Sequence, residues 1–183
     1  MTETITRDGA YIPQFAETPV MTMTRRTFVT ASSVLALGGA FATAACAKAP
    51  ARKYELTLAD AEWKKRLTPA QYRTLRQDAT DTPYRSPFLN EKRVGIFSCA
   101  GCALPLYSSK AKYDSGTGWP SFWQALPKAT LTNTDRTLGI ERVEVVCRRC
   151  GGHLGHVFDD GPQPTGKRHC INGTALGFAP GRA

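Results

Sequence analysis

Two short cysteine motifs, Phe97-Ser-Cys-Ala-Gly-Cys102 and Val146-Cys-Arg-Arg-Cys-Gly-Gly152, decide how this chain is expected to fold. Each motif is a Cys-x-x-Cys pair, and two such pairs supply the four thiolates that a tetrahedral structural Zn²⁺ site commonly uses. The expected ligands are Cys99, Cys102, Cys147 and Cys150. Because protein fills every coordination position, the predicted zinc is structural and ties two distant loops together. Two separate redox dithiols or disulfides are the alternative interpretation.

The composition of the chain and the distance between its two cysteine pairs limit the kinds of protein that this sequence can encode. The chain has 183 residues, of which 42% are hydrophobic and 21% charged, which is typical of about one folded domain with extensions. The formal net charge is +9, which could suit an acidic partner or simply keep the surface soluble. Segment 103–146 between the cysteine pairs is much longer than the roughly 15–20 residues of a compact zinc ribbon, so no nucleic-acid partner is expected.

Residues 1–46 have the layout of an export signal. Thr24-Arg-Arg-Thr-Phe-Val-Thr30 precedes a moderately apolar stretch, 31–45, that ends in small residues. This order resembles the bacterial twin-arginine signal, which predicts an exported, periplasmic protein. A chance Arg-Arg pair before an apolar helix is the alternative. Met21 or Met23 is a candidate start site.

Two processing routes stay open at the end of this segment. Small residues before Ala45, or Ala45-Cys46-Ala47, would suit a signal peptidase. Thr43-Ala44-Ala45-Cys46 is instead an imperfect lipoprotein box, in which Cys46 would carry a lipid and anchor the protein to the membrane, facing the periplasm. Residues 47–57 are then expected to be a polar linker, and residues 58–183 the catalytic domain.

The domain is predicted to be mainly β, with two short helices at its start. The helices are expected over 58–67 and 68–77, with Thr68 as the N-cap and Pro69 at the first helical position. Short runs of β-branched and aromatic residues predict strands at 94–97, 103–107, 130–134, 138–146, 155–158 and 175–178. In the fourth run, Ile140 and Val143 alternate with charged residues, which indicates a half-buried strand.

Cys170 is the candidate nucleophile, in Gly166-Lys-Arg-His-Cys-Ile-Asn-Gly173. Nearby cations lower the pKa of a thiol, and the thiolate is the reactive form. A buried, inert cysteine is the alternative. His153 and His156 lie three residues apart, and both imidazoles could face one cleft as proton donors. Zinc ligation is the alternative for them, but four cysteines already fill a zinc shell.

A glycine-rich aromatic segment, Asp114-Ser-Gly-Thr-Gly-Trp-Pro-Ser-Phe-Trp123, is a candidate ligand-binding loop. Its glycines permit tight turns that could present Trp119 to a ligand. The alternative for Phe122 and Trp123 is that they belong to the core.

In their order along the chain, these motifs resemble the B-type methionine sulfoxide reductases over about residues 55–180. The resemblance implies two antiparallel β-sheets with a remote structural zinc, and reduction of the R epimer of methionine sulfoxide. It implies that Cys170 attacks the sulfoxide sulfur and becomes a sulfenic acid. It further implies that Trp119 and Phe158 form an apolar wall for the substrate methyl group. The groups implied to bind the sulfoxide oxygen are His153, His156 and Asn172, and Arg168 is implied to favour the thiolate.

The sequence departs from the family at two positions. Thr117 stands where many members have a second, resolving cysteine, which predicts a one-cysteine cycle completed by an external thiol. A thioredoxin-like donor is a candidate, although such proteins usually act on a disulfide. His169 replaces the usual Tyr or Phe and is expected to tune the thiolate in a direction that the sequence leaves open.

The sequence leaves more than one substrate and more than one function open. The substrate is either free methionine-R-sulfoxide or oxidised exported proteins, and a monomer is expected. A non-catalytic zinc-binding module and a thiol redox sensor that reacts directly with peroxide are the competing functions.

Overall fold

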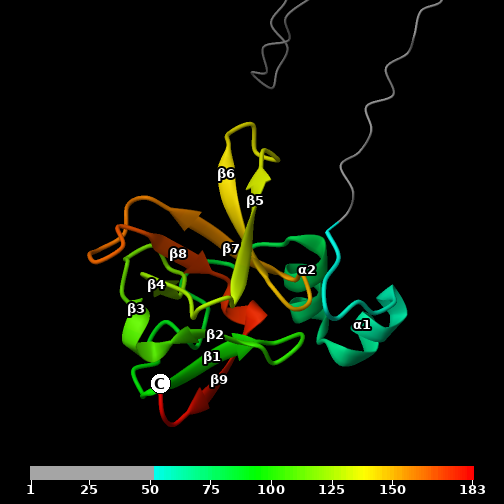
Figure 1. Ribbon diagram of the computed structural model, residues 1–183, viewed down its shortest axis with the longest axis horizontal. Helices are drawn as coiled ribbons and strands as arrows, with labels where there is room; N and C mark the ends of the chain where they lie inside the picture. Colours follow the sequence, from blue (N-terminus) through cyan, green and yellow to red (C-terminus); the bar gives the residue numbers. More distant parts are fainter. Residues whose placement is uncertain (1–51) are drawn as a thin grey trace, which may run out of the picture. The chain divides into compact units, whose positions relative to one another are not determined.

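The computed structural model describes residues 52–183, which form two antiparallel β-sheets preceded by two short helices (Figure 1). The predicted fold class, mainly β with two antiparallel sheets and short N-terminal helices, is therefore confirmed. The twin-arginine segment 1–46, its processing site and the candidate lipid anchor Cys46 lie outside the described residues. The domain boundaries stay a prediction, and the end of the expected linker packs on the domain, since Leu56 N–H donates to the Arg149 carbonyl at 2.9 Å.

The two helices are α1 (Asp60–Arg66) and α2 (Pro69–Gln77). Thr68 caps α2, as predicted: its hydroxyl accepts from Gln71 N–H at 3.2 Å, and the Gln71 side chain accepts from Thr68 N–H at 3.1 Å. This reciprocal capping box satisfies two backbone donors that the first turn leaves free. Neither helix, within residues 52–183, is long and apolar enough to cross a membrane.

The strands divide into a small and a large sheet. The small sheet has the order β2 (Pro105–Ser108), β1 (Gly95–Cys99), β9 (Leu176–Pro180). The large sheet has the order β3 (Lys112–Tyr113), β4 (Ser121–Phe122), β8 (Arg168–Ile171), β7 (His153–Phe158), β6 (Arg142–Cys147), β5 (Thr130–Asp135). Short 3₁₀ helices cover Ser109–Ala111 and Gly173–Ala175.

All six expected strands are present, but the fourth is shorter than predicted. Strand β6 begins at Arg142, and Leu138 and Ile140 are 68% and 62% exposed in the turn before it. Val143 is also exposed, so its apolar side chain does not mark the buried face of the strand. Three strands, β3, β4 and β8, were not predicted, because they are only two to four residues long and carry few β-branched residues.

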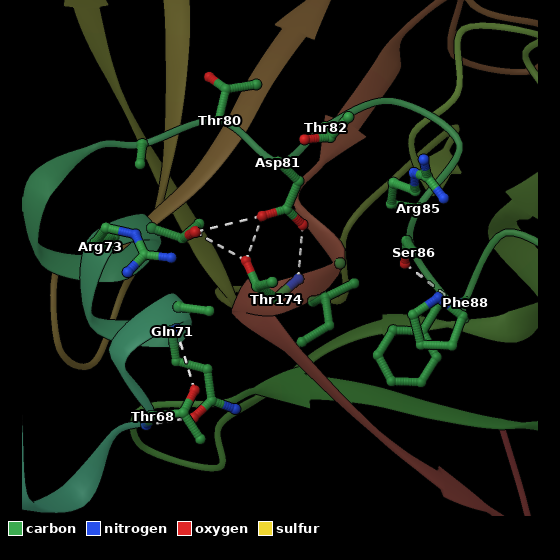
Figure 2. Close-up of a pocket in the computed structure, with 16 residues that line it drawn as sticks. Thr68, Gln71, Arg73, Thr80, Asp81, Thr82, Arg85, Ser86, Phe88 and Thr174 are labelled. Atoms are coloured by element: carbon green, nitrogen blue, oxygen red, sulfur yellow. Dashed lines mark hydrogen bonds between the residues drawn. The ribbon is translucent and has the colours of Figure 1, made fainter.

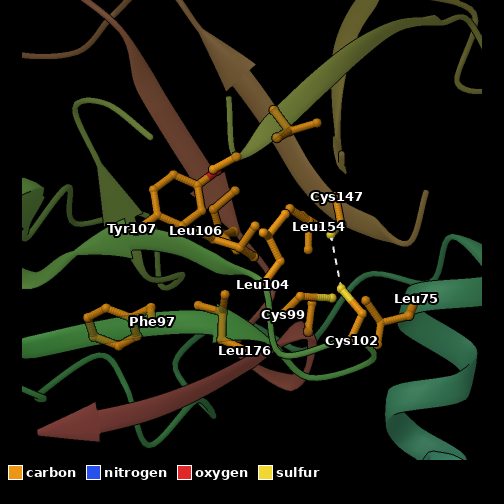
Figure 3. Close-up of a cluster of buried hydrophobic side chains, with 14 of the residues drawn as sticks. Leu75, Phe97, Cys99, Cys102, Leu104, Leu106, Tyr107, Cys147, Leu154 and Leu176 are labelled. Carbon is orange, nitrogen blue, oxygen red and sulfur yellow. Dashed lines mark hydrogen bonds between the residues drawn. The ribbon is translucent and has the colours of Figure 1, made fainter. Parts of the chain in front are cut away.

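The core lies between the two sheets and extends to the helices (Figure 3). Phe97 and Tyr107 come from the small sheet, and Phe122 comes from the large sheet. The ring centroids of Tyr107 and Phe122 are 4.3 Å apart, and those of Phe97 and Phe122 are 5.1 Å apart. Phe122 is fully buried, so it is a core residue, and half-buried Trp123 packs beside it. At the other end of the core, Leu75 of α2 is buried in the same cluster as the paired cysteines.

Strand β7 carries a β-bulge near its N-terminal end, where it pairs with β6. Val145 of β6 pairs with Gly155, but the next residue, Val146, pairs with His153, so Leu154 is an extra residue on β7. Gly155 has φ +151°, and a Cβ there would lie 2.1 Å from the Cys170 carbonyl oxygen. Only glycine lets β7 approach β8 this closely.

Gly155→Ala is therefore expected to destabilise the domain. The added methyl group must displace the β8 backbone as well as adopt an unfavourable φ, and we expect the free energy of unfolding in urea to fall by about 2–4 kcal/mol. Gly177→Ala in β9 is the matched control, since a Cβ there has no atom within 4 Å. Equal losses in the two variants would show that the close contact does not require Gly155.

Candidate functional site

Cys170 lies half-buried on β8, between β4 and β7 of the large sheet. Its Cα partners are Ser121 on β4 and His156 on β7. The residue lines a cavity of about 130 Å³. The other residues around this cavity are Thr80, Trp119, Arg142, Gly155, His156, Phe158 and Asn172. The structure thus brings five of the seven expected catalytic and substrate-binding residues to one cavity.

Strand pairing explains how these side chains meet. Alternate residues of a strand face the same side, so Arg168, Cys170 and the following Asn172 share a face. Antiparallel pairing sets His156 beside Cys170 and Phe158 beside Arg168. Residues that are neighbours across a strand pair have their Cβ atoms within about 5.5 Å of each other. Cys170 and its polar neighbours on these strands are therefore positioned by backbone hydrogen bonds and not by a flexible loop.

The bulge on β7 brings His153 to the same side as His156. Residues three apart on a regular strand face opposite sides, and one extra residue corrects this. The two imidazole centroids are 5.5 Å apart. His153 is buried and lines, together with His156, a neighbouring hollow of about 250 Å³. Its Nε2 has no hydrogen-bond partner among the described residues.

Two carboxylates hold these imidazoles, and neither was among the expected site residues. Glu144 Oε1 lies 2.7 Å from His153 Nδ1, and Asp135 Oδ2 lies 2.8 Å from His156 Nε2. Arg142 also pairs with Asp135, at 2.6 Å. Asp135 ends β5, and Glu144 lies on β6, where charged residues alternate with valine as on a solvated strand face. No local sequence signal identifies them, because sheet register alone brings Glu144 opposite His156 and within reach of His153.

Burial lowers the pKa of His156, and the hydrogen bond to Asp135 only partly offsets this. The imidazole is therefore mostly neutral at pH 7. With its Nε2–H donated to Asp135, its Nδ1 is left as an acceptor. His156 in this state accepts a hydrogen bond in the cavity, from water or from a protonated oxygen.

Asn172 and Trp119 are both bonded to the backbone of Asp81. Asp81 N–H donates to Asn172 Oδ1 at 2.8 Å, which identifies the amide oxygen, because a backbone N–H can only donate. Asn172 Nδ2 donates to the Leu154 carbonyl at 3.2 Å, and its second N–H has no partner within residues 52–183. Trp119 Nε1 donates to the Asp81 carbonyl at 2.9 Å. Both side chains are consequently fixed in orientation.

Arg168 stacks on the Phe158 ring and acts electrostatically on Cys170. Its guanidinium carbon lies 4.4 Å from the Phe158 ring centroid, and the group donates twice to Asp160, at 2.8 Å each. Burial raises the pKa of the Cys170 thiol, while the Thr117 hydroxyl and the Arg168 charge lower it in part. The resting thiol is thus mostly protonated at neutral pH.

The two departures from the family have structural counterparts. Thr117 Oγ1 lies 4.0 Å from Cys170 Sγ, so position 117 adjoins the nucleophile. His169 faces the other side of β8, where its Nδ1 lies 3.3 Å from the Tyr107 hydroxyl. Burial lowers the pKa of His169 to about 4, so it is neutral at pH 7 and supplies no positive charge to Cys170.

The four paired cysteines form a separate, buried cluster. Figure 3 shows three of them, Cys99, Cys102 and Cys147. Cys99 Sγ lies 3.7 Å from Cys150 Sγ, and Cys102 Sγ lies 3.5 Å from Cys147 Sγ. These separations exceed the roughly 2.05 Å of a disulfide. Sulfurs about 2.3 Å from a tetrahedral zinc would be about 3.8 Å apart. The donor set and its geometry fit a single metal ion, as predicted for all four cysteines.

Comparison with known proteins agrees with this geometry. The family model for the SelR domain matches residues 67–180. The peptide methionine sulfoxide reductase MsrB of Leptospira interrogans is 48% identical over 126 residues, which cover 68% of this chain and 96% of that protein. The mitochondrial methionine-R-sulfoxide reductase B2 of Homo sapiens is 48% identical over 134 residues, which cover 69% of this chain and 74% of that protein. The chain is therefore a member of the MsrB family of peptide methionine sulfoxide reductases, which are oxidoreductases.

Proposed function

We propose that the protein reduces methionine-R-sulfoxide to methionine through a sulfenic acid on Cys170. The observation that carries the proposal is the two-sided cavity at Cys170. Trp119 and Phe158 give it an apolar side, and His156 and Asn172 give it a polar side. A methyl sulfoxide needs both, since its methyl group is apolar and its oxygen is a strong hydrogen-bond acceptor.

The reaction transfers one oxygen atom from the substrate to Cys170. The Cys170 thiolate attacks the sulfoxide sulfur, the oxygen is protonated, and the oxygen then passes to Cys170 as its bond to the substrate sulfur breaks. Cys170 is oxidised by two electrons to a sulfenic acid, and the sulfoxide is reduced to methionine. The proton that leaves the Cys170 thiol passes through water to Nδ1 of neutral His156 and from there to the developing oxygen, while the second N–H of Asn172 donates a hydrogen bond to that oxygen.

The apolar wall accounts for the choice of epimer. With the sulfur held at Cys170 and the methyl group against Trp119, the R epimer directs its oxygen toward the polar side. The S epimer would direct its oxygen into the aromatic wall, where no donor compensates for lost hydration.

The four-cysteine cluster is proposed to bind one structural Zn²⁺. Four thiolates leave the ion no open position for substrate, and the ion would join the loop after β1 to the loop between β6 and β7. Its contribution is to folding and not to the chemical step.

Cys170 must be returned to the thiol by a second reductant. The remaining cysteines of the described domain belong to the metal cluster, so we propose that an external thiol, free or on a thioredoxin-like protein, attacks the sulfenic acid directly. A mixed disulfide and then a second thiol complete the two-electron reduction.

The protein is proposed to act outside the cytoplasm on oxidised exported proteins. The support is Arg25-Arg26 followed by the apolar stretch that ends at Cys46. The intact mass of protein from the periplasmic and membrane fractions would distinguish peptidase cleavage from lipidation at Cys46. Recovery of the protein in the cytoplasmic fraction, with residues 1–45 retained, would contradict export.

An epimer-resolved assay with dithiothreitol tests the proposed reaction. Purified protein is expected to convert the R epimer and not the S epimer, and the same sample is expected to contain one zinc per chain. Cys170→Ser should lose turnover but keep the zinc, because Cys170 is outside the cluster. Cys147→Ser should lose the zinc and unfold at a lower temperature. Equal turnover of both epimers, or an active Cys170→Ser, would refute the proposal.

Thr117→Cys is expected to convert the one-cysteine cycle into a two-cysteine cycle. The side chain at this position already lies 4.0 Å from Cys170 Sγ. After one turnover without reductant, the variant should contain a 117–170 disulfide in a peptide map, and thioredoxin should then reduce it. Wild-type protein and Thr117→Ser should contain a sulfenic acid that dimedone traps. A stable disulfide to Cys170 in the wild-type protein would overturn the one-cysteine cycle.

Arg168→Met is expected to move the pH dependence of Cys170 alkylation upward by about one unit. The Arg168 charge lowers the pKa of the thiol, so its removal leaves less thiolate at any given pH. Lys167→Met is the matched control, because it removes the same charge from a side chain that pairs with Asp159 on the exposed surface. The idea fails if the two variants shift the iodoacetamide profile equally.

A further inference from the structure

Asp81 occupies the irregular segment that follows α2, beside a hollow of about 520 Å³ (Figure 2). Its carboxylate accepts a hydrogen bond from Thr174 N–H at 2.8 Å and others from the hydroxyls of Thr174 and Thr74. Thr74 belongs to α2, and Thr174 belongs to the 3₁₀ helix two residues beyond Asn172. The carboxylate therefore fastens this segment to two regular elements.

The backbone of the same residue holds both sides of the catalytic cavity. Its N–H donates to Asn172 Oδ1, and its carbonyl accepts from Trp119 Nε1. One residue thus joins the group expected to bind the sulfoxide oxygen to the wall expected to receive the methyl group. Asp81 does not line the 130 Å³ cavity, whereas its neighbour Thr80 lines both that cavity and the larger hollow.

The side chain decides whether these backbone bonds stay in place. Any residue has an N–H and a carbonyl, but this segment has no helix or strand of its own to hold it. It also borders a large hollow, so on that side it lacks packed neighbours that would resist displacement. A carboxylate that accepts three hydrogen bonds supplies the missing restraint.

We propose that Asp81 is a positioning residue that sets the relative placement of Trp119 and Asn172, and through it the discrimination between sulfoxide epimers. The proposal rests on the proposed reductase function. Asp81 does not touch the substrate. A shift of the Trp119 wall relative to the Asn172 amide would give the S-epimer oxygen room and weaken binding of the R epimer.

Asp81→Asn is the first test. Asparagine keeps the size of the side chain but removes the charge and leaves one acceptor oxygen, so it cannot accept from Thr174 N–H and from the two hydroxyls at once, as the carboxylate does. We expect a higher KM for the R epimer, a kcat/KM lower by about 10- to 100-fold, and a smaller ratio of R to S turnover. Asp81→Glu should recover most of the ratio, since the neighbouring hollow can accommodate one more methylene. Asp60→Asn, which removes an exposed carboxylate on α1, is the matched control.

A double-mutant cycle with Trp119→Phe identifies the route of the effect. Phenylalanine keeps an aromatic wall but lacks the N–H that bonds to Asp81. If Asp81 acts through Trp119, Asp81→Asn should change the epimer ratio less in the Trp119→Phe background than in the wild type. Should Asp81→Asn fold poorly, Thr174→Val removes one donor to the same carboxylate and should shift the ratio in the same direction.

The outcomes separate this inference from the proposed function. Rates are expressed per reactive Cys170 thiol, so a loss of folded molecules leaves KM and the epimer ratio unchanged. An unchanged KM and ratio in Asp81→Asn, in a wild-type background that reduces the R epimer, would overturn the positioning role alone. Absence of R-epimer turnover in the wild-type protein would instead overturn the proposed function.

Discussion

The close approach of β7 to β8 is the constraint on which the catalytic cavity depends. At Gly155 the two backbones are so near that a Cβ would lie 2.1 Å from the Cys170 carbonyl oxygen. The adjacent bulge turns His153 to the same side as His156, and the pairing then sets His156 directly beside Cys170. A regular strand in place of the bulge would direct one imidazole away from the cavity. The backbone therefore determines the arrangement of Cys170 and the two imidazoles, whatever rotamers the side chains adopt.

Sequence reasoning recovered what is encoded locally. The Cys-x-x-Cys pairs, the Thr68 cap and the strands rich in β-branched residues each carry their signal within a few residues. Strand β8 was missed because Arg168–Ile171 is short and polar, although it bears Cys170. Asp135 and Glu144 were missed because their partners are distant in sequence and are brought close only by sheet register. The motif resemblance identified five residues that line the cavity, whereas the residues that hold them in place become visible only in the folded structure.

The electrostatics of Cys170 reflect a balance between burial and a nearby cation. Burial favours the neutral thiol, which limits direct oxidation, since peroxide reacts with the thiolate. The Arg168 charge favours the thiolate but is shared with Asp160 and stacked on Phe158. A substrate that displaces water from the cavity strengthens the interaction between Arg168 and the thiolate, because screening falls as water leaves. This balance favours a sulfoxide-dependent reductase over a peroxide sensor.

Asn172 and His156, two polar groups of the cavity, have a feature in common. Each uses some of its hydrogen-bonding atoms on neighbouring protein groups and has at least one further donor or acceptor that a ligand could use. Asn172 Oδ1 accepts from Asp81 N–H, one Nδ2–H donates to the Leu154 carbonyl, and the second Nδ2–H has no partner among the described residues. His156 Nε2–H donates to Asp135, which leaves Nδ1 as an acceptor. Groups fixed in this way lose little conformational freedom when the reaction begins, and their dipoles need not reorient as charge develops. Asp81 is the point where this fixation extends to the apolar wall, because its backbone bonds Trp119 as well. Polar and apolar halves of the cavity are consequently held by one short segment, so their separation can match a single epimer.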